Sequence, residues 1–406
     1  MRKKITIIGI NYFPEDTAIG LYTTQLAQYL VENNFDVDVI TGFPYYPAWR
    51  INESYKSKGK FYQETINGVN IFRYKQYVPK KPNFIKRILH LLDFSIGTFF
   101  NTFKIKETDL VLCVVPFIGS VFIGKILAKF KKAKLWIHVQ DFEFDAATDS
   151  NLVGNKNIIF NTLFFIEKKL LKSADFISTI STSMVKKLEN KVPETRNKLL
   201  SNWVDANFIQ PNNYKTHTYL KSSKFKILYS GNIGEKQDWD LFIKFAKEIE
   251  KLNDVEIVVV GNGSKRIWLE ESLLDLDNIR FYSPVPYNEL SYLLCSADLH
   301  ILFQKVDVID TVMPSKILAM MSSAKPSLIT GNIQSEVSSI IKESKSGMYF
   351  DSQDCKPLLD FVFELKSEKN LQKQFGESAR SYVIENYSKS KILEQFKIES
   401  LKLIDN

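Results

Sequence analysis

Cysteine is scarce in this sequence of 406 residues, and its scarcity excludes two common kinds of small domain. The three cysteines, Cys113, Cys295 and Cys355, lie far apart and form no Cys-x-x-Cys pair. Neither a disulfide framework nor a zinc site is therefore expected. Cys113 and Cys295 stand within apolar runs, so we expect them to be small buried hydrophobic residues in a protein of a reducing compartment.

Long hydrophobic runs are also absent. The apolar run Ile5–Ile10 is shorter than a signal-peptide core and is followed by the polar Asn11, so it predicts a β-strand instead. The longest apolar stretch begins at Leu110 and is interrupted by Pro116, and it falls short of the ~18–20 residues that a membrane-spanning helix needs. These features favour a cytoplasmic protein.

Several functional motifs are missing. The four histidines, at positions 90, 138, 217 and 300, form no triad-like pattern with a serine or cysteine, which argues against hydrolases of that type. The Gly-x-Gly-x-x-Gly fingerprint is absent, which argues against a nicotinamide oxidoreductase. The net charge is +8, but no zinc-finger spacing, RNA-binding aromatic signature or basic heptad region accompanies it, so no nucleic-acid partner is expected. The positive charge instead favours phosphorylated small molecules or an anionic membrane.

Short β-branched runs alternate with helical patterns along both halves of the chain. This alternation predicts α/β architecture with two Rossmann-like, doubly wound parallel sheets. We expect a first domain at 1–210, a second at 211–385 after a polar linker, and a final helical segment at 386–406 that packs back on the first half. The expected strands lie at 5–10, 37–41, 69–74, 110–115, 135–140, 176–181, 225–230, 255–261, 279–282, 299–303, 327–330 and 347–350. Ligands of such domains bind at the carboxyl ends of the strands, in a cleft that the two domains face.

Two loops at strand ends are candidates for holding a phosphate. Ile19 and Gly20 precede a helix expected from Leu21, and a helix N-terminus offers unpaired N–H groups and a positive dipole end. An ordinary strand-to-helix turn is the alternative. The second loop contains Gly231, Asn232 and Lys236, whose glycine permits close backbone approach and whose side chains suit a diphosphate. A solvated turn is the alternative there.

Further candidates follow other strands of the second half. Gly261 and Gly263 form a sharp turn that either approaches a nucleotide or simply reverses the chain. Val285, in the loop after strand 279–282, is a further candidate for the donor site. Pro314, Ser315 and Lys316 open a helix, where a phosphate or a sugar hydroxyl is a plausible ligand and a simple helix start is the alternative.

Polar groups follow strand 135–140 in the first half. Gln140, Asp141 and Glu143 are therefore candidates for a catalytic role, because a carboxylate pair at a strand end is suited to acid–base chemistry. Asp141 is the principal candidate. Binding of a metal ion is the alternative for these acids, although no histidine cluster supports a transition metal. His138 stands inside the strand and is expected to be a packed residue.

A basic and aromatic segment runs from Lys80 to Lys106. One interpretation is an amphipathic helix at the surface of an anionic membrane. The alternative is a helix whose Ile88–Phe100 face covers the first sheet, and its basic edge still suits anionic lipid.

Taken together, several motifs resemble those of a known family. They are Gly9–Glu15 with Gly20, Pro44–Trp49, His138–Ala146, Ser178–Thr182, Asn202–Asp205, Tyr229–Lys236 and Met313–Lys316. Over nearly its whole length the chain resembles family 4 retaining glycosyltransferases of the GT-B fold. More narrowly, it is similar to colanic acid fucosyltransferases of the WcaI type.

The resemblance implies an N-terminal acceptor domain and a C-terminal donor domain, with Gly20, Asn232 and Lys236 at the donor diphosphate. The sequence departs from the family pattern at three places. Asn232 stands where most members have arginine, Ala319 where many have a ribose-binding glutamate, and Gln140 where many have histidine. Lys316 is expected to share the binding of the donor.

The expected activity is transfer of a sugar from a nucleotide-diphosphate-sugar to a lipid-linked or oligosaccharide acceptor. It would serve bacterial surface polysaccharide biosynthesis (capsule, exopolysaccharide or O-antigen). The resemblance implies retention of configuration, without a metal ion or a cofactor besides the donor, in an enzyme of the cytoplasm or the inner face of the membrane. Two alternatives remain: an isomerase resembling nucleotide-sugar 2-epimerases, and a non-catalytic protein that binds sugar nucleotides.

Overall fold

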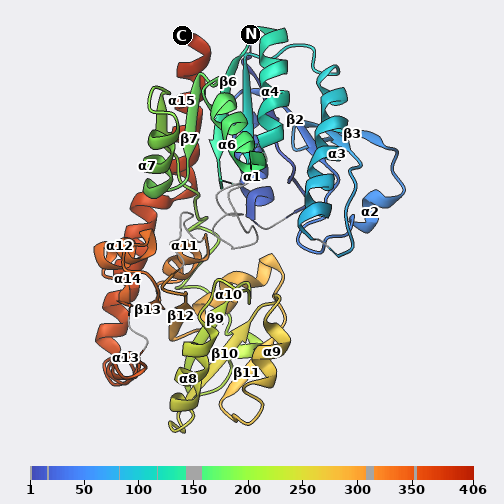
Figure 1. The fold of residues 1–406 in the computed structure, drawn as a ribbon. Coiled ribbons are helices and arrows are strands. Elements are labelled where there is room, and N and C mark those ends of the chain that lie inside the picture. The colour runs from blue at the N-terminus through green and yellow to red at the C-terminus, as the bar shows by residue number, and fades with distance from the viewer. Residues whose placement is uncertain are drawn as a thin grey trace. The chain divides into compact units, whose positions relative to one another are not determined.

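The computed structural model describes residues 2–15, 18–81, 83–116, 118–142, 158–307, 315–351 and 354–406. The chain forms two compact units. Unit 1 comprises Met1–Asn202 and Ile392–Asn406, and unit 2 comprises Trp203–Lys391. Figure 1 shows the helices and strands of both units with their labels.

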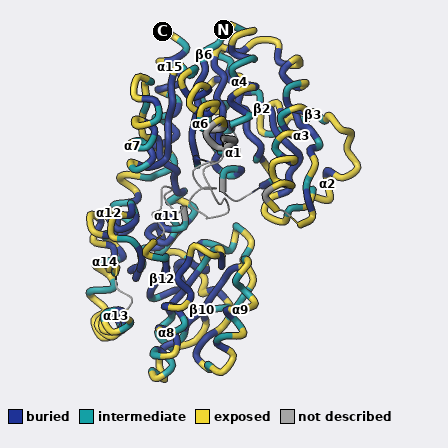
Figure 2. Tube along the Cα trace, viewed as in Figure 1, coloured by how far each residue is buried: buried dark blue, intermediate teal, exposed yellow. Residues whose placement is uncertain are grey.

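Unit 1 is built on a sheet of eight strands in the order β3-β4-β2-β1-β5-β6-β7-β8. All neighbouring strands are parallel except β3 and β4. The central strands are buried on both faces, as continuous β-branched runs in parallel sheets usually are (Figure 2). The strands are β1 (Lys4–Ile8), β2 (Asp36–Gly42), β3 (Phe61–Ile66), β4 (Val69–Tyr74), β5 (Leu110–Val115), β6 (Lys134–Val139), β7 (Phe176–Thr179) and β8 (Asn197–Leu199).

Helices cover the sheet of unit 1. They are α1 (Ala18–Glu32), α2 (Glu53–Lys56), α3 (Phe84–Thr102), α4 (Ile118–Lys131), α6 (Ile158–Leu171), α7 (Thr182–Lys191) and α15 (Lys389–Asp405). Residues 392–405 of α15 belong to unit 1, where Phe396 stacks on Trp136 with ring centroids 5.4 Å apart. The segment 386–406, expected to return to the first half, thus corresponds largely to α15.

Unit 2 contains a sheet of six parallel strands in the order β11-β10-β9-β12-β13-β14. They are β9 (Phe225–Ser230), β10 (Val255–Val260), β11 (Ile279–Tyr282), β12 (Leu299–Phe303), β13 (Ser327–Thr330) and β14 (Gly347–Phe350). The direction of strand progression reverses between β9 and β12, and ligands of doubly wound sheets bind at the carboxyl ends of strands at such a point. The predicted α/β class with two doubly wound sheets is confirmed.

The helices of unit 2 are α8 (Trp239–Ile249), α9 (Arg266–Glu271), α10 (Leu290–Cys295), α11 (Ser315–Ser322), α12 (Glu336–Ser344), α13 (Lys356–Ser367) and α14 (Lys369–Tyr387). Short 3-10 helices lie at Thr218–Leu220 and Tyr287–Glu289. Cys113 and Cys295 are buried in their units, as expected.

The expected boundary at 210/211 differs from the one in the structure, which falls between Asn202 and Trp203. The polar segment 211–223, which we expected to be a linker, belongs to unit 2 because its Leu220 is fully buried in that core. Arg380 on α14 donates to the carbonyl oxygens of Ala206 and Ile209, at 2.9 and 3.0 Å. These hydrogen bonds hold the segment just before residue 211 to the same unit.

Two strands of unit 1 were not predicted. β3 pairs antiparallel with β4 through the turn Asn67-Gly68, whose positive φ values of 50° and 79° suit a two-residue hairpin. The other, β8, has three residues. Within the described ranges, no helix has both the length and the apolar character needed to cross a membrane.

Candidate functional site

The loops that follow β9 and β10 lie against each other with backbone in contact with backbone. A β-carbon added to Gly261 would lie 1.9 Å from the carbonyl oxygen of Gly231, and one added to Gly263 would lie 2.3 Å from that of Ile233. Three backbone hydrogen bonds join the loops, from Gly231 to Val260 and from Ile233 to Asn262, both at 2.9 Å, and from Lys265 to Ile233 at 3.0 Å. Gly261 and Gly263 are therefore required by this close approach, whether or not a ligand is present.

Lys316, in the first turn of α11, reaches the same place. A β-carbon on Gly231 would lie 3.3 Å from Cδ and 3.5 Å from Nζ of Lys316. The ammonium group lies 3.4 Å from the hydroxyl of the buried Tyr229 and 5.1 Å from the centre of its ring. Burial raises the pKa of the Tyr229 hydroxyl, which is therefore a neutral partner for the lysine. Gly231, Gly261 and Lys316 thus converge at the carboxyl ends of neighbouring strands.

Three residues that the sequence analysis did not select hold these loops in place. The backbone N–H of Gly234 donates to the Gln237 side chain at 3.1 Å, and the Trp239 indole donates to the Gly234 carbonyl at 2.8 Å. Arg266 donates to the carbonyl of Gly261 at 2.7 Å. The burial of the polar Gln237 became evident only from the fold, and nothing in the sequence pattern distinguishes Arg266 from a surface arginine.

Asn232 and Lys236 occupy different parts of the first loop. β-carbons added to Gly234 and Gly263 would approach the Asn232 side-chain amide to 2.7 and 2.8 Å, so this amide lies between the two loops. Lys236 is exposed, and its carbonyl accepts a hydrogen bond from Lys305 beyond the end of β12. Among the described residues, the ammonium group of Lys236 makes no ion pair or hydrogen bond. Its charge is therefore available to a ligand.

The remaining candidates of the second half are placed only in part. Val285 lies in the loop after β11 and is half-buried against the core of unit 2. Ser315 is the first residue of α11, but its side chain is not described, and Pro314 lies outside the described residues. Ala319 is also half-buried against the core, on the same helix as Lys316.

In unit 1, Gly20 makes room for a buried carboxylate. α1 begins at Ala18 rather than at Leu21, and a β-carbon on Gly20 would lie 2.9 Å from Cβ and 3.2 Å from Oε2 of Glu15. Glu15 accepts hydrogen bonds from the backbone N–H groups of Tyr45 and Tyr46 at 2.7 and 2.8 Å. Burial nevertheless raises the pKa of Glu15.

The neighbouring Ile19 is half-buried in the first turn of α1, and its carbonyl accepts a hydrogen bond from Thr23 at 2.8 Å. Glu15 was not selected from the sequence. The packing of Glu15 is a structural reason for Gly20 that does not involve a ligand.

Gln140 is fixed by a chain of buried polar groups in unit 1. Its amide exchanges two hydrogen bonds with the amide of Asn202, each 2.9 Å long, and its nitrogen also donates to Nε2 of His138 at 2.9 Å. Nδ1 of His138 lies 2.8 Å from the hydroxyl of Ser178, which also accepts from the Trp136 indole. Burial lowers the pKa of His138 to about 3, so the ring is neutral and, with Nε2 accepting, carries its proton on Nδ1. His138 is a packed residue, as predicted.

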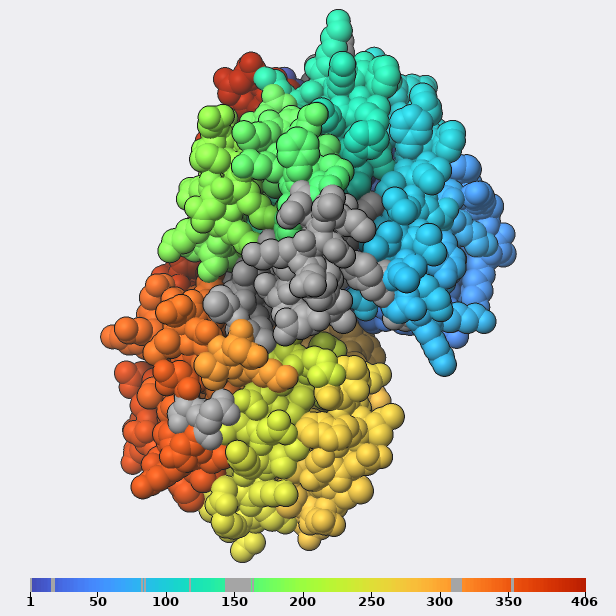
Figure 3. Space-filling view, viewed as in Figure 1, coloured from blue at the N-terminus to red at the C-terminus, as the bar shows by residue number. Residues whose placement is uncertain are grey.

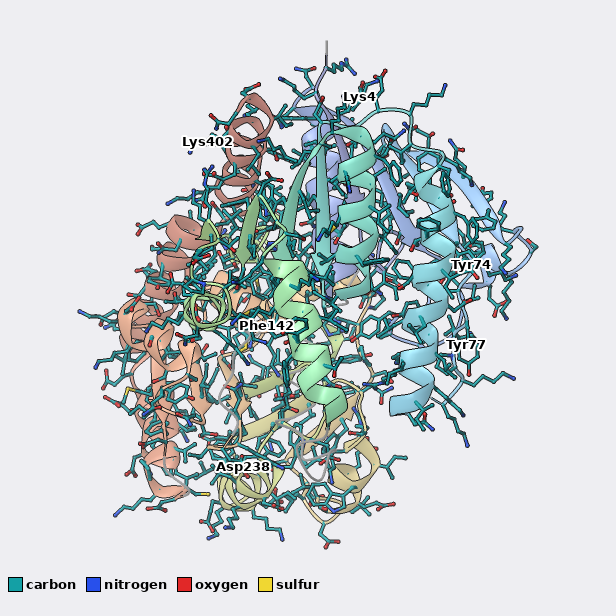
Figure 4. The ribbon with its side chains drawn as sticks, turned by 45° about the horizontal axis from the view of Figure 1, so that its top comes forward. Lys4, Tyr74, Tyr77, Phe142, Asp238 and Lys402 are labelled. Atoms are coloured by element: carbon teal, nitrogen blue, oxygen red, sulfur yellow. The ribbon has the colours of Figure 1, made fainter. Side chains whose placement is uncertain are left out.

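Asp141 directly follows this fixed glutamine and is half-buried. The adjacent Phe142 is buried, with the ammonium groups of Lys187 and Lys191 at 5.6 and 5.1 Å from its ring centre (Figure 4). Glu143 lies outside the described residues. In the ranges that the structure covers, no three His, Cys, Asp or Glu side chains gather in a way that could hold a metal ion.

Unit 2 therefore offers a place suited to a phosphate: glycine-lined backbone at the carboxyl ends of β9 and β10, with the ammonium group of Lys316 beside it. Residues 212–382 match the family model described as glycosyl transferases group 1. Over 351 residues the chain is also 33% identical to an Escherichia coli (strain K12) relative, across 82% of this chain and 84% of the relative. The chain belongs to the group 1 glycosyltransferase family. The relative carries the name of the colanic acid biosynthesis glycosyl transferase WcaI.

Solved structures of glycosyltransferases share the fold. Sucrose-phosphate synthase from Thermosynechococcus elongatus aligns with a TM-score of 0.74 at 13% identity, covering 100% of both chains. Anabaena HepE, solved in complex with UDP-glucose, aligns with a TM-score of 0.68 at 10% identity, covering 98% of this chain and 99% of that one. The fold is GT-B, as predicted.

Proposed function

We propose that this glycosyltransferase moves a sugar from a nucleotide-diphosphate-sugar to a lipid-linked or oligosaccharide acceptor, with retention of configuration and without a metal ion. The proposed role is the assembly of a bacterial surface polysaccharide at the inner face of the cell membrane. The name of the Escherichia coli relative, which refers to colanic acid biosynthesis, supports this setting.

One observation carries the assignment of the donor site to unit 2. Gly231 and Gly261 bring two loops into contact at the ends of β9 and β10, and Lys316 lies directly over Gly231. Gly231 has no side chain, so a diphosphate beside Lys316 has access to the Gly231 backbone. The ammonium groups of Lys316 and Lys236 supply positive charge for its oxygens. That HepE is solved with UDP-glucose agrees with this class of donor.

The chemistry follows from where charge develops. The bond between the sugar C1 and the terminal phosphate oxygen of the donor breaks, and the electron pair leaves with the nucleoside diphosphate. A bond forms between C1 and the acceptor oxygen on the same face of the sugar, and the proton of the acceptor hydroxyl passes to an oxygen of the departing diphosphate. Lys236, Lys316 and Asn232 stabilise the departing diphosphate in this proposal. Asp141, which directly follows the hydrogen-bonded Gln140, orients the donor sugar or the acceptor hydroxyl in this proposal.

Substitution of Lys236 tests the assignment. Lys236→Ala should lower transfer by about 100-fold, as the loss of a group that stabilises transition-state charge commonly does. Lys247→Ala is the matched control, because Lys247 is an exposed lysine on α8 of the same unit. Equal activity of the two variants would refute the role of Lys236.

The reaction class needs its own test. The purified protein is incubated with a panel of nucleotide sugars in EDTA, with and without a lipid-linked acceptor. Acceptor-dependent release of nucleoside diphosphate supports transfer. An altered donor sugar without any acceptor would identify an isomerase instead, and no turnover with any donor would leave only a binding protein.

A further inference from the structure

Helix α3 exposes many of its apolar residues and buries several polar ones, which is the reverse of an ordinary surface helix. It buries His90, Thr98, Asn101 and Thr102 together with Phe94. Its solvent side carries large apolar residues, of which Ile85 is 68% exposed and Ile96 62% exposed. The others are Ile88, Leu89, Leu92 and Phe100, and Phe103 follows directly after the helix. A helix that covers a core normally turns its apolar stripe inward, so this outward stripe requires another explanation.

Specific contacts fix the rotation of α3 about its axis. Asp93 accepts hydrogen bonds from the hydroxyl of Tyr74 at 2.9 Å and from the backbone N–H of Tyr77 at 2.6 Å (Figure 4). His90 is hydrogen-bonded to the carbonyl of Tyr77. A β-carbon on Gly97 would lie 2.1 Å from the Tyr74 ring, so only glycine fits at this contact. Turning the apolar stripe inward would break these contacts, and the stripe therefore faces outward in the folded protein.

The apolar exposure continues on the next helices of the same layer. α3 packs beside α4, and α4 beside α6. Exposed residues on these two helices are Phe122, Phe130, Phe165 and Ile166. Figure 3 shows the atoms of α3, α4 and α6, coloured from cyan to green, on its visible face. The apolar surface thus extends beyond a single helix.

Positive charge flanks this apolar stripe at both ends of the helix. Lys80, Lys81 and Lys86 lie near the start of α3, and Lys104 and Lys106 lie just beyond its end. All five lysines are exposed. The acid of α3 is Asp93, whose carboxylate already accepts hydrogen bonds from unit 1 itself. An apolar stripe between clusters of lysine complements a partner that has an apolar interior beneath a negatively charged outer layer.

We propose that the exposed side of α3, extended by α4 and α6, docks on an anionic phospholipid bilayer. The isoleucine, leucine and phenylalanine side chains enter the region between headgroups and acyl chains, and the lysines bind lipid phosphates. This inference deepens the proposed function, on which it rests for the lipid-linked acceptor. Pairing with a second copy of the chain is less favourable, because self-complementary pairing of two α3 stripes brings like-charged lysine clusters together.

Vesicle co-sedimentation of the full chain tests this docking surface. The vesicles contain either phosphatidylcholine alone or equimolar phosphatidylcholine and phosphatidylglycerol. The triple variant Ile85→Gln, Leu92→Gln and Ile96→Gln should bind the anionic vesicles at least about tenfold more weakly than the natural chain, because three aliphatic side chains that enter the bilayer are lost. The triple variant Lys80→Gln, Lys81→Gln and Lys86→Gln should lose the preference for phosphatidylglycerol.

The matched control replaces exposed apolar residues of unit 2, in the double variant Ile267→Gln and Leu274→Gln, and should bind like the natural chain. Equal vesicle binding of the α3 variant and the control would overturn the proposal. So would a dimer of the natural chain that dissociates in the α3 variant without any vesicle binding, since the stripe would then be a self-association surface.

Stabilisation by nucleotide sugars and transfer to a water-soluble acceptor report on the function separately. Both should persist in the α3 variants. Loss of vesicle binding in the α3 variants with intact transfer would confirm the docking surface. Absence of transfer by the natural chain would count against the proposed function and not against the docking surface.

Discussion

The carbonyl oxygen of Gly231 lies where the side chain of Gly261 would begin, at 1.9 Å from an ideal β-carbon. Two backbone segments from neighbouring strands therefore share a space that excludes any methyl group. Gly261→Ala should destabilise the protein by about 1–3 kcal/mol, as overpacking of a filled interior does. Thermal unfolding checks this expectation. Gly59→Ala is the matched control, because the nearest atom to its added β-carbon is 3.7 Å away. Equal melting temperatures of the two variants would contradict the observed contact.

Lys316 combines packing and charge, which a single substitution separates. Lys316→Met retains an unbranched chain against Gly231 and the Tyr229 ring but removes the ammonium group. A charged hydrogen bond contributes roughly 1.5–3 kcal/mol, so the affinity for a nucleoside diphosphate should fall by about tenfold or more. Isothermal titration with UDP and GDP measures this change, with Lys247→Met as the control. Unchanged affinity for every nucleotide that binds the natural chain would exclude Lys316 from the diphosphate site.

His138 predicts a dependence of stability on pH. Its pKa falls from an ordinary 6.5 to about 3 in the folded chain because the ring is buried. Between these two values the unfolded chain binds a proton that the folded chain does not, so stability is lost as the pH falls from 6.5 towards 3. His300 is buried likewise and contributes with the same sign. His138→Gln should therefore reduce the slope of unfolding free energy against pH in this range by at most roughly 1.4 kcal/mol per pH unit. Denaturant unfolding at several pH values measures the slope, and identical slopes for the two proteins would refute this assignment.

The paired amides of Gln140 and Asn202 predict a strong coupling. Asn202→Leu leaves the buried amide oxygen of Gln140 without its partner, which should cost about 1–3 kcal/mol. The double variant Gln140→Leu and Asn202→Leu should be less destabilised than the sum of its single variants. Unfolding free energies of all four proteins give the coupling. Strictly additive losses of unfolding free energy would argue against a direct interaction between the two amides. If the position of Asp141 depends on this pair, transfer should also fall in each single variant.

Much of unit 2 was predictable because its strands are short runs rich in β-branched residues, such as Val255–Val260, in which Glu256 is the one polar residue. β3 was missed because its side chains include Gln63 and Glu64, and only the following Asn67-Gly68 turn indicated a hairpin. The buried position of Leu220 could not be read from a polar segment, so the domain boundary was placed too late in the chain.

The candidate site shows a similar limit. The glycines of the second half were found by their positions after strands, but the contact between Gly231 and Gly261 depends on the pairing of β9 with β10. Gly20 was selected as a phosphate-binding glycine, whereas the structure shows it packed against Glu15, five positions earlier in the chain. α3 is apolar along most of its length, so its sequence pattern did not show which side the sheet would cover.

The hydrogen bonds from Arg380 to the carbonyl groups of Ala206 and Ile209 have a practical consequence for producing the two units separately. A fragment that starts at Pro211 would lack Val204 and Ile209, which are both buried in the unit 2 core, and would leave that core open to water. A fragment from Trp203 to Lys391 keeps both residues and the carbonyl groups that Arg380 binds. The half that carries the proposed nucleotide site can thus be produced as one unbroken polypeptide, whereas its counterpart requires residue 202 to be spliced to residue 392.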